Sequence, residues 1–584
     1  MTIKRINREV IIKKGEERIN ATNNESKEVV VEHKDRPSLF REGEQFEVDD
    51  LYVYKIDDNG KKINISNYMG LESITWNIDT NECKGVIKYR FFNKDMKIEV
   101  NRQNYINKNK LIDLIKDGLD ITHRNINDLV DYFRESEEKF ESPSYIHSNI
   151  GFSEFKDKTI YKLNKAIGIE STYVGNYELE PKGRKEEYEY MLKKEVYGKT
   201  ELELIIAVAL SAVIIGYIGE EMALDTNIFH LVGNSTTGKS TALRLGISLF
   251  AFPDNRKSSL YSTYNGTNNA IIKRMTGIKG VPFALDEVSM GTTNNFSRFV
   301  YIAANGVDKQ RLNKDSELKE SGTWLTTILS NGEKSLIDSS NKNAGIKVRV
   351  IEAKNISWTK DAENSNNINK VILQNYGYIG IEFAEYVMKM GKEEVKNDFY
   401  TVQKFVYEKI KEKILVDKMT ERRCTKFASI ILAAYYYEDM KDIELDIDGM
   451  IDILANIEKE SIRERNFSTS AIDYIKQYIS KFKRKFETKD NTPIDTLGKL
   501  IPKREWIEVQ MNKISFEEMI KQGGYEDKNV VLRELKQNGY LNCESDRFTR
   551  SRKSPVGYTQ EVYVIKLPKE QIIDEEEDFE EVII

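Results

Sequence analysis

The spacing of apolar and polar residues changes several times along the chain, and each change indicates a different kind of structure. From Phe46 onward, short alternating runs predict the strands of an antiparallel sheet. These runs are Leu51–Ile56, Ile74–Ile78, Val86–Phe92 and Met96–Val100. Helical spacing follows at Lys108–Gly118 and at Ile126–Glu138, where Asn125 is a candidate N-cap. Together with strands and turns in Ser148–Leu163, they predict an N-terminal α+β module over residues 46–195, behind a polar, mobile arm at 1–45.

A long apolar run precedes the centre of the chain. Leu202–Ile218 is apolar except for Glu203 and Ser211, so a membrane span is one interpretation. The run is slightly short for that role, carries a carboxylate, and ends ten residues before the next strand-like run. A helix that is apolar on all sides is also typical of a domain core. We therefore predict a buried helix beneath a sheet, and no membrane partner.

Three apolar runs separated by helical patterns predict an α/β domain over residues 196–486. The runs are Ile228–Val232, Val281–Glu287 and Trp324–Ser330. Between the first two lie a helix-like segment, Thr241–Phe250, and a polar turn followed by a helix, Ser259–Arg274. Ala344–Ala353 alternates through Ile346, Val348 and Val350, which predicts a last strand. Residues 370–482 have helical spacing and complete the domain.

The C-terminal region has the pattern of a winged helix over residues 495–568, after a linker at 487–494. A strand at Trp506–Val509 precedes two helices, Ser515–Gln522, capped by Ser515, and Lys528–Asn538. Tyr540–Cys543 and Val562–Lys566 then predict two strands on either side of a basic segment. Residues 569–584 form an acidic tail.

Composition narrows the possible functions. The chain has 584 residues, a net charge of −6 and 32% charged residues, so any contact with nucleic acid must come from a local basic surface. Three widely separated cysteines and four histidines argue against a disulfide framework or a structural zinc site. Because Met1–Lys14 has no apolar core, we expect no signal peptide and a cytoplasmic location.

The first candidate site is the stretch Gly233–Ser240, which matches G-x-x-x-x-G-K-S between a strand and a helix. Backbone N–H groups of such a loop and the helix N-terminus bind phosphate oxygens. We expect Lys239 to contact the β- and γ-phosphates of ATP and Ser240 to ligate Mg²⁺. A chance match in a Gly/Ser/Thr-rich loop is the alternative, and the flanking strand and helix argue against it. The predicted nucleotide contacts are Gly233, Asn234, Ser235, Thr236, Thr237, Gly238, Lys239, Ser240 and Thr241.

The second candidate site is the pair of acids at the end of Val281–Glu287, which has a Walker B pattern. Asp286 would hold the Mg²⁺ shell, and Glu287 would orient and polarise the attacking water. A strand that happens to end at an Asp-Glu turn gives the same letters. The acids follow Ser240 by 46 residues, with one helical segment between, which favours the catalytic interpretation.

Further polar residues follow the later strands. Asn331, at the end of Trp324–Ser330, could bind the γ-phosphate or the lytic water, although Asn331-Gly332 is also good turn chemistry. Arg349 could reach the γ-phosphate held by a neighbouring subunit, or could be a solvated edge arginine. Arg422 or Arg423 could be a second phosphate sensor, with Arg423 preferred, or part of a solvated first turn of Glu421–Tyr437.

Two basic segments are candidates for DNA contact. Asn305–Ser321 predicts a polar hairpin whose Lys309, Arg311 and Lys314 could bind DNA phosphates, although its acids fit an ordinary surface hairpin equally well. The segment between the last two strands carries four cations beside Phe548, and a wing that contacts protein is the alternative there. These cations are Arg547, Arg550, Arg552 and Lys553.

These motifs resemble the AAA+ ATPase of phage, plasmid and genomic-island helicases. The resemblance rests on Val-Gly-Asn-Ser-Thr-Thr-Gly-Lys-Ser-Thr, Ala-Leu-Asp-Glu, Ala-Asn-Gly-Val-Asp-Lys-Gln-Arg, Leu-Ser-Asn-Gly-Glu and Ala-Gly-Ile-Lys-Val-Arg-Val-Ile-Glu. It is strongest for the self-loading helicases and replication initiators of staphylococcal pathogenicity islands and cassette chromosomes. It implies an MCM-like AAA+ fold, a homo-hexameric ring, ATP-driven unwinding and a hairpin in the pore, with Lys314 as the best hairpin candidate.

The expected fold class is multidomain α/β, with an N-terminal α+β module, an AAA+ P-loop ATPase with a helical region, and a C-terminal winged helix. The expected function is that of an ATP-dependent DNA helicase that initiates replication of a mobile element. Its partners would be single-stranded, forked and origin DNA. Two alternatives remain open: a P-loop ATPase that remodels proteins or senses nucleic acid, and an origin-binding protein whose assembly ATP controls.

Overall fold

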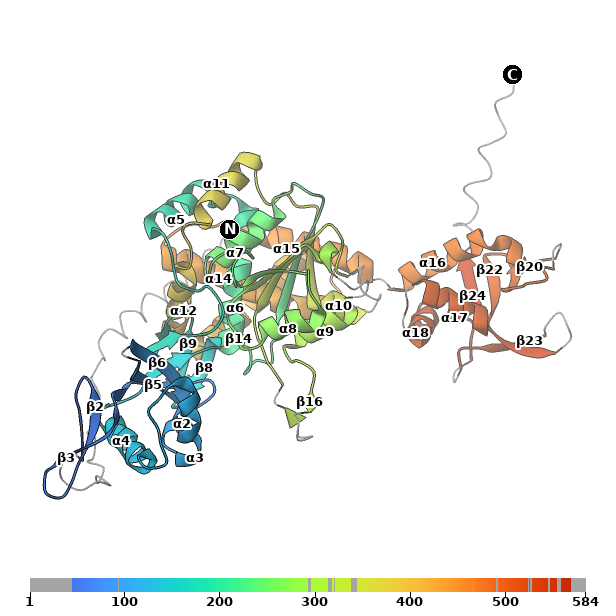
Figure 1. Ribbon diagram of the computed structural model, residues 1–584. Coiled ribbons are helices and arrows are strands. Elements are labelled where there is room, and N and C mark those ends of the chain that lie inside the picture. The colour runs from blue at the N-terminus through green and yellow to red at the C-terminus, as the bar shows by residue number, and fades with distance from the viewer. Residues whose placement is uncertain are drawn as a thin grey trace.

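The computed structural model describes residues 45–568 except 93, 292–295, 313–317, 320, 338–343, 466, 490–491, 524, 526–527, 545–546 and 554–557 (Figure 1). The predicted N-terminal arm, apart from Gln45, and the acidic tail lie outside these residues, as does Lys314. Within them the chain forms an N-terminal module, a central α/β domain and a C-terminal domain, which stands apart from the rest in Figure 1.

The predicted strands of the N-terminal module are confirmed. β4 (Met69–Asn77), β5 (Glu82–Phe91) and β6 (Lys94–Asn101) are antiparallel neighbours in a five-stranded sheet that β7 (Ser144–His147) and β11 (Ser171–Tyr173) complete. A smaller sheet contains β1 (Phe46–Val48), β2 (Tyr52–Ile56) and β3 (Lys62–Asn67). Leu129 and Phe133 of α4 (Ile126–Glu138) are fully buried in the module's core.

Two local predictions for this module were wrong in detail. Asn125 does not cap α4 with its side chain. Its amide instead donates to the carbonyls of Ile65 and Asp120 at 2.9 and 3.0 Å, and therefore ties the helix start to β3 and a neighbouring loop. The helical run Lys108–Gly118 is a single turn, α3 (Lys108–Leu111), followed by the 3-10 helix η1 (Ile112–Asp117).

The N-terminal module and the central domain share a sheet. β8 (Ile150–Phe155), β9 (Lys158–Lys162) and β10 (Ala166–Ile167) are extended by β14 (Ile278–Lys279), which comes from the central domain and is parallel to β8. Gly151 has φ +91°, and a Cβ there would lie 1.6 Å from the carbonyl oxygen of Lys279. This close approach requires glycine and fixes the two parts to each other.

The central domain contains a five-stranded parallel sheet in the order β13-β15-β18-β12-β19. Its strands are β12 (Asn227–Val232), β13 (Tyr261–Thr263), β15 (Phe283–Asp286), β18 (Thr327–Gly332) and β19 (Val350–Lys354). The strand that ends near Asn331 therefore lies directly beside the strand that leads into Gly233. The short strand β13 falls where the sequence indicated only a polar turn.

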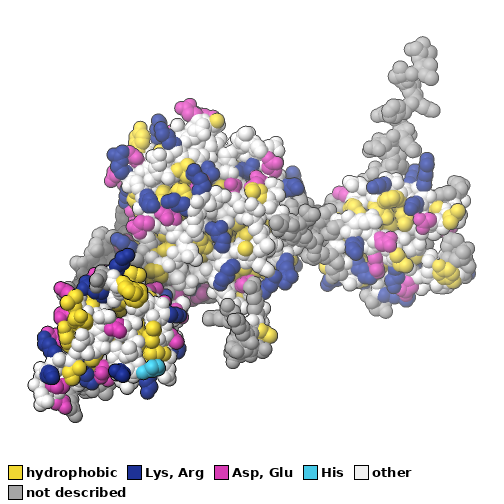
Figure 2. Space-filling view, in the orientation of Figure 1, with side chains coloured by type: hydrophobic (Ala, Val, Ile, Leu, Met, Phe, Trp, Pro, Cys, Tyr) yellow, Lys and Arg dark blue, Asp and Glu magenta, His cyan; other side chains and the backbone are white. Residues whose placement is uncertain are grey.

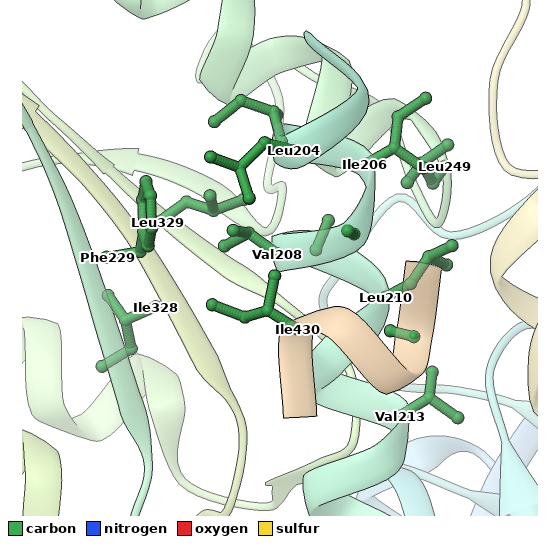
Figure 3. Close-up of a cluster of buried hydrophobic side chains, with 14 of the residues drawn as sticks. Leu204, Ile206, Val208, Leu210, Val213, Phe229, Leu249, Ile328, Leu329 and Ile430 are labelled. Atoms are coloured by element: carbon green, nitrogen blue, oxygen red, sulfur yellow. The ribbon is translucent and has the colours of Figure 1, made fainter. Parts of the chain in front are cut away.

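The apolar run at the start of the domain forms α6 (Thr200–Ile218). This helix is long and apolar enough to cross a membrane, but 94% of its most apolar stretch is buried inside the protein. Figure 3 shows its side chains Leu204 and Val208 facing Phe229 and Leu329 of the sheet, with Ile430 of α14 close by. The prediction of a buried helix beneath the sheet is confirmed.

Ala344–Ala353 is not one strand, as predicted. Residues Ala344–Arg349 form helix α10, and only Val350–Lys354 form β19. Ile346 and Val350 are both buried although one lies on the helix and the other on the strand. The apolar residues at every second position suggested a strand. Here the same spacing arises because a helix end is joined directly to a strand, and both bury apolar side chains.

Helices α11 (Ala362–Ile372), α12 (Ile379–Met390), α13 (Lys392–Lys413), α14 (Lys418–Lys441) and α15 (Ile447–Arg465) form the helical region. A hairpin of β16 (Arg311–Leu312) and β17 (Leu318–Lys319) projects from the body of the domain (Figure 1). Its base is closed by a bridge between Val307 and Thr323.

The C-terminal domain begins earlier than predicted. Ile475 and Ile479 of α16 (Phe467–Lys481) share a separate core with Phe516, Leu532 and other residues of the winged-helix region. Because α16 buries its apolar face there, it belongs to the C-terminal domain, whereas the predicted boundary at 486/487 left it with the ATPase.

The two helices and the strands at Trp506–Val509 and Val562–Lys566 follow the prediction, but the predicted strand Tyr540–Cys543 is wrong. Only Leu541 makes an isolated bridge there, to Ile565, and the strand that pairs with β24 (Thr559–Pro568) is part of the basic segment itself. The sheet of this domain has the order β20-β21-β22-β24-β23, and its other strands are β20 (Phe486–Glu487), β21 (Gly498–Pro502), β22 (Trp506–Asn512) and β23 (Arg550–Lys553). The helices are α17 (Lys513–Gln522) and α18 (Lys528–Gln537). Ser515 lies inside α17 and Asn512 is at the N-cap position, so the predicted cap was wrong.

Candidate functional site

The loop Gly233–Gly238 joins β12 to α7 (Lys239–Ser248) at the carboxyl end of the parallel sheet. Gly238 has φ +80°, and a Cβ there would lie 2.4 Å from Thr359 Oγ1, so the position requires glycine. The Lys239 ammonium donates to the carbonyls of Gly233 and Asn234 at 2.8 and 2.7 Å. A lysine held across the mouth of a glycine-bounded loop is placed to exchange these carbonyls for phosphate oxygens.

One predicted nucleotide contact faces elsewhere. The Thr241 hydroxyl contacts Ser365 Oγ at 2.7 Å and accepts from Asn369 Nδ2 at 2.7 Å, both on α11. Its side chain therefore joins α7 to α11, and only its backbone remains available to the loop. Asn234, Ser235 and Thr236 are exposed at the loop tip, where Ser235 Oγ donates to Glu333 Oε1 at 2.5 Å.

The structure brings the Walker A and Walker B candidates together. Ser240 Oγ donates to Asp286 Oδ1 at 3.0 Å, and Tyr261 Oη donates to the other carboxylate oxygen, Oδ2, at 2.6 Å. A hydroxyl and a carboxylate oxygen are the hard donors that Mg²⁺ uses when phosphate oxygens and water supply its remaining ligands. Ser240 and Asp286 therefore fit a nucleotide-bound Mg²⁺, although the described residues contain no cluster of three or more His, Cys, Asp or Glu that could hold a metal alone.

Asn331 connects the two motifs. It is 1% exposed within β18, so it is not a turn residue. Its Oδ1 accepts from the backbone N–H of Glu287 at 2.7 Å, and its Nδ2 donates to Ser240 Oγ at 3.3 Å. The Asn331 amide therefore links the candidate serine of the phosphate loop to the candidate glutamate after β15.

Glu287 has an unusual backbone conformation. Its φ is +61° and its ψ is +82°, a region that a β-carbon disfavours. Its carboxylate accepts from the N–H of Ser289 at 3.3 Å and from Ser289 Oγ at 2.5 Å. Non-glycine residues held at positive φ are concentrated at functional sites, because the surrounding structure must offset the strain.

Arg349 lies at the amino ends of the strands, whereas the phosphate loop lies at their carboxyl ends. It directly precedes Val350, which pairs with Ile228 near the start of β12, whereas the phosphate loop follows the end of that strand. Five residues of strand correspond to a separation of about 17 Å. Its Nη1 donates to the carbonyl of Gly345 at 2.9 Å, and its guanidinium lies 4.7 Å from the centre of the Tyr301 ring. Arg349 is therefore remote from the phosphate loop of its own chain.

Arg423 is not placed as a phosphate sensor. It is 1% exposed, donates to Glu458 Oε2 at 2.5 Å, and donates to the carbonyls of Lys347 and Val350 at 2.5 and 2.7 Å. A guanidinium with a buried carboxylate and two carbonyls holds α14 against α10 and β19. The preference for Arg423 over Arg422 was therefore wrong. The two arginines are adjacent near the start of a helix, and the sequence there does not indicate which of them faces inward.

Arg422 is exposed and lines a cavity with Asp225, Asn227 and Lys426. Burial lowers the pKa of Lys426 to about 8, and Arg423, Arg349 and Arg422 act in the same direction. These cations therefore lie close to one another at the edge of the sheet that carries Arg349.

The predicted DNA contacts lie on two separate surfaces. Lys309 is half-buried at the hairpin base, where its Nζ donates to Asn269 Oδ1 at 3.2 Å. Arg311 begins β16. In the C-terminal domain, Arg552 and Lys553 lie on β23, which pairs with β24 to form a wing one strand later than predicted. On the face shown in Figure 2, lysine and arginine side chains are scattered among acidic ones.

The wing arginines differ in how they are engaged. Arg550 donates to Glu544 Oε1, Asn542 Oδ1 and the carbonyl of Cys543 at 3.1 to 3.2 Å, so it supports the wing. Arg547 also pairs with Glu544, at 2.7 Å. Arg552 donates to the carbonyl of Ser551, and Lys553 is exposed. Arg552 and Lys553 are therefore the better placed of the four to contact a partner.

Helix α18 has an exposed polar face that we did not predict. Asn529, Arg533 and Gln537 are exposed and four residues apart, so they follow one another along the helix. Lys536 Nζ donates to the carbonyl of Glu544 and lies 5.8 Å from the centre of the Phe548 ring, which joins this helix to the wing. Asparagine, arginine and glutamine at this spacing are the signal that could have identified the face.

Two family models match separate parts of the chain. Residues 46–323 match a family described as "Domain of unknown function (DUF927)", and residues 466–570 match one described as "Cch helix turn helix domain". The second match begins with α16, where the structure places the domain boundary. No curated protein matches the chain.

A solved structure described as "SCCmec type IV Cch - active helicase" is similar to the chain, with a TM-score of 0.73 and 23% identity over 91% of this chain and 99% of that one. The chain therefore has the fold of that helicase. The multidomain α/β fold class and the C-terminal helix-turn-helix domain are confirmed, and the resemblance to helicases of cassette chromosomes is confirmed at the level of fold.

Proposed function

We propose that the chain is a cytoplasmic, ATP-dependent DNA helicase of the AAA+ class, and that it initiates replication of a mobile genetic element. The observation that carries the proposal is the side chain of Asn331, which bonds to both Ser240 Oγ and the Glu287 N–H. It gathers the Walker A, Walker B and sensor candidates at one edge of a parallel sheet. The fold shared with a solved active helicase supports unwinding rather than another use of ATP.

The residues of this site divide the chemistry among them. Lys239 and the N–H groups of the loop bind the phosphates and neutralise their charge. Ser240 and Asp286 hold Mg²⁺, which supplies further charge neutralisation when it is bound with ATP. Glu287 orients the attacking water and accepts its proton, and Asn331 fixes the backbone of Glu287 in position.

Hydrolysis requires a second subunit in this account. Arg349 lies about 17 Å from the loop of its own chain, by the length of β12, so it completes the site of a neighbour. Arg422 is exposed among the same group of cations and is the second residue that we assign to the neighbour's phosphates. Repetition of this head-to-tail contact builds a closed ring, which we propose to be a hexamer.

DNA binds on two surfaces in the proposed enzyme. The hairpins Arg311–Lys319 line the ring's channel and grip single-stranded DNA through their cations, with Lys309 and Lys314 included. The second strand of the hairpin, β17, leads along the chain into β18, which carries Asn331. Through this connection, the state of the nucleotide is linked to the position of the hairpin. The C-terminal domain binds duplex DNA at the origin with its wing and α18.

The proposal is tested by ATP hydrolysis with and without DNA. Wild type should hydrolyse ATP faster with single-stranded or forked DNA, and Lys239→Ala should be inactive. Glu287→Gln should bind ATP and not turn it over, because an amide cannot accept the proton. Hydrolysis that DNA does not stimulate would favour a protein-remodelling ATPase, and origin binding without hydrolysis would favour an ATP-controlled binding protein.

A further inference from the structure

A tyrosine outside the recognised motifs contacts the candidate Mg²⁺ ligand. Tyr261 Oη donates to Asp286 Oδ2 at 2.6 Å, while Ser240 Oγ donates to Oδ1 at 3.0 Å. Each oxygen of the Asp286 carboxylate therefore has a different partner. The carboxylate is therefore held from both sides, by a residue of the phosphate-loop helix and by a residue of β13.

The register of the sheet explains why a tyrosine is needed. β13 is parallel to β15, and Tyr261 pairs with Ala284, two residues before Asp286. Residues two apart on a strand share a face and lie about 6.6 Å apart. A tyrosine can extend along the strand over that distance, whereas a serine or threonine at the same position cannot. Ser262 lies on the opposite face, where it accepts from Arg274 at 2.6 Å.

The ring of Tyr261 has little freedom to move. It is 1% exposed, and the Arg244 guanidinium of α7 lies 5.7 Å from its centre. Arg244 is itself paired with Asp254 at 3.3 Å. Packing from the phosphate-loop helix therefore fixes the phenol, and the phenol in turn fixes the carboxylate.

We propose that Tyr261 is a positioning residue that orients Asp286 for a nucleotide-bound divalent cation, an inference that rests on the function proposed above. When one oxygen of a carboxylate is already bonded, the other oxygen points in a single direction. The Asp286 side chain therefore loses less conformational entropy when the cation binds. Residues that orient metal ligands in this way commonly contribute a factor of about 10 to 100 in metal affinity. A purely structural tyrosine would contribute to stability and leave the cation affinity unchanged.

Tyr261→Phe tests this, because it removes the hydroxyl and keeps the buried ring. The measurement is the binding of a fluorescent ATP analogue by the full chain, with a chelator and then across a Mg²⁺ titration, together with Mn²⁺ binding by electron paramagnetic resonance. We expect the half-saturating cation concentration to rise about 10-fold or more. Affinity for the nucleotide in chelator should stay within about twofold, because the phosphate loop is unchanged.

Tyr264→Phe is the matched control. Tyr264 is also 1% exposed, and its hydroxyl contacts Ser330 Oγ at 2.8 Å instead of a candidate ligand. It should lower the thermal midpoint about as much as Tyr261→Phe and leave the cation titration unchanged. An unchanged titration in Tyr261→Phe, or an equal shift in both variants, would overturn this inference alone. A wild type that binds no nucleotide under either condition would overturn the proposed function, and this inference with it.

Discussion

The backbone N–H of Glu287 donates to the side-chain oxygen of Asn331 at 2.7 Å, and this bond holds the glutamate at a φ of +61°. Glu287 directly follows β15, and Asn331 lies on β18, the strand beside it. The bond fixes the backbone from which the catalytic carboxylate projects. A side chain held in this way keeps its orientation only while the bond is present, so the pair makes a direct prediction.

Asn331→Ala should lower kcat for ATP hydrolysis about 100-fold or more, the usual cost of losing a group that positions the reaction. Affinity for ATP should change little, because Lys239 and the loop remain. Steady-state hydrolysis and direct nucleotide binding measure the two effects. Ser335→Ala is a suitable control, since that hydroxyl bonds Glu352 at 2.7 Å and not a residue of the nucleotide site. Equal kcat values for Asn331→Ala and wild type would remove Asn331 from the mechanism.

Arg349 should act between subunits. Arg349→Ala and Lys239→Ala should each abolish hydrolysis alone, whereas mixed rings should recover part of it. In a mixed ring, an intact loop of one variant can meet an intact Arg349 of the other. Arg349→Lys should rescue poorly, because lysine cannot grip phosphate through two parallel bonds. Mixtures as inactive as the separate variants would show that the two residues do not serve one shared site.

The C-terminal domain should read DNA in two ways. Arg533→Ala should cost about 1–3 kcal/mol on a preferred duplex and reduce its preference over other sequences. Arg552→Ala should weaken binding to all sequences alike. It should also reduce by about 1 the slope of the logarithm of the binding constant against the logarithm of the salt concentration. Both are measured by titration of selected and scrambled duplexes at several salt concentrations.

Lys503→Ala is the control for these DNA-binding variants. Lys503 is exposed beyond the far end of β22, whose Trp506 pairs with Pro568, whereas Arg550 of the wing pairs with Val562 near the other end of β24. Equal losses for Lys503→Ala and Arg552→Ala would mean that general charge, and not the wing, provides the affinity.

Lys426 should give the chain a specific dependence of stability on pH. Its pKa is about 8 in the folded chain, below the usual value of about 10.4. Between these values the unfolded chain holds a proton that the folded chain has released, so the free energy of unfolding rises with pH. Relative to Lys426→Met, that free energy should rise by about 1.5 kcal/mol from about pH 8 to about pH 9.5. Urea unfolding at both pH values measures it, and a constant difference would contradict the assignment.

The sequence predicted the parts of the site that depend on local pattern. Gly233, Gly238, Lys239 and Ser240 lie in one short loop and the first turn of the helix that follows it, so their spacing alone defines the geometry. Asp286 and Glu287 end a buried strand, and Asn331 ends the next, so the rule that parallel strands present their carboxyl ends at one edge brought them together. Each inference required only a strand, its end and its order in the sheet.

What the sequence could not supply depends on packing between distant segments. Tyr261 meets Asp286 only because β13 adopts one particular register beside β15. Arg423 is buried because Glu458, 35 residues later, faces it. Helix α16 resembles the preceding helices in pattern, and only its contact with Phe516 and Leu532 assigns it to the C-terminal domain.

Strand separation tests the central claim most directly. The substrate is a forked DNA duplex with ATP and Mg²⁺, and the proteins are the full-length wild type and Lys239→Ala. The account predicts that wild type separates the strands and that Lys239→Ala, which lacks the cation at the mouth of the phosphate loop, does not. DNA-stimulated hydrolysis without strand separation by wild type, or equal separation by both proteins, would contradict it.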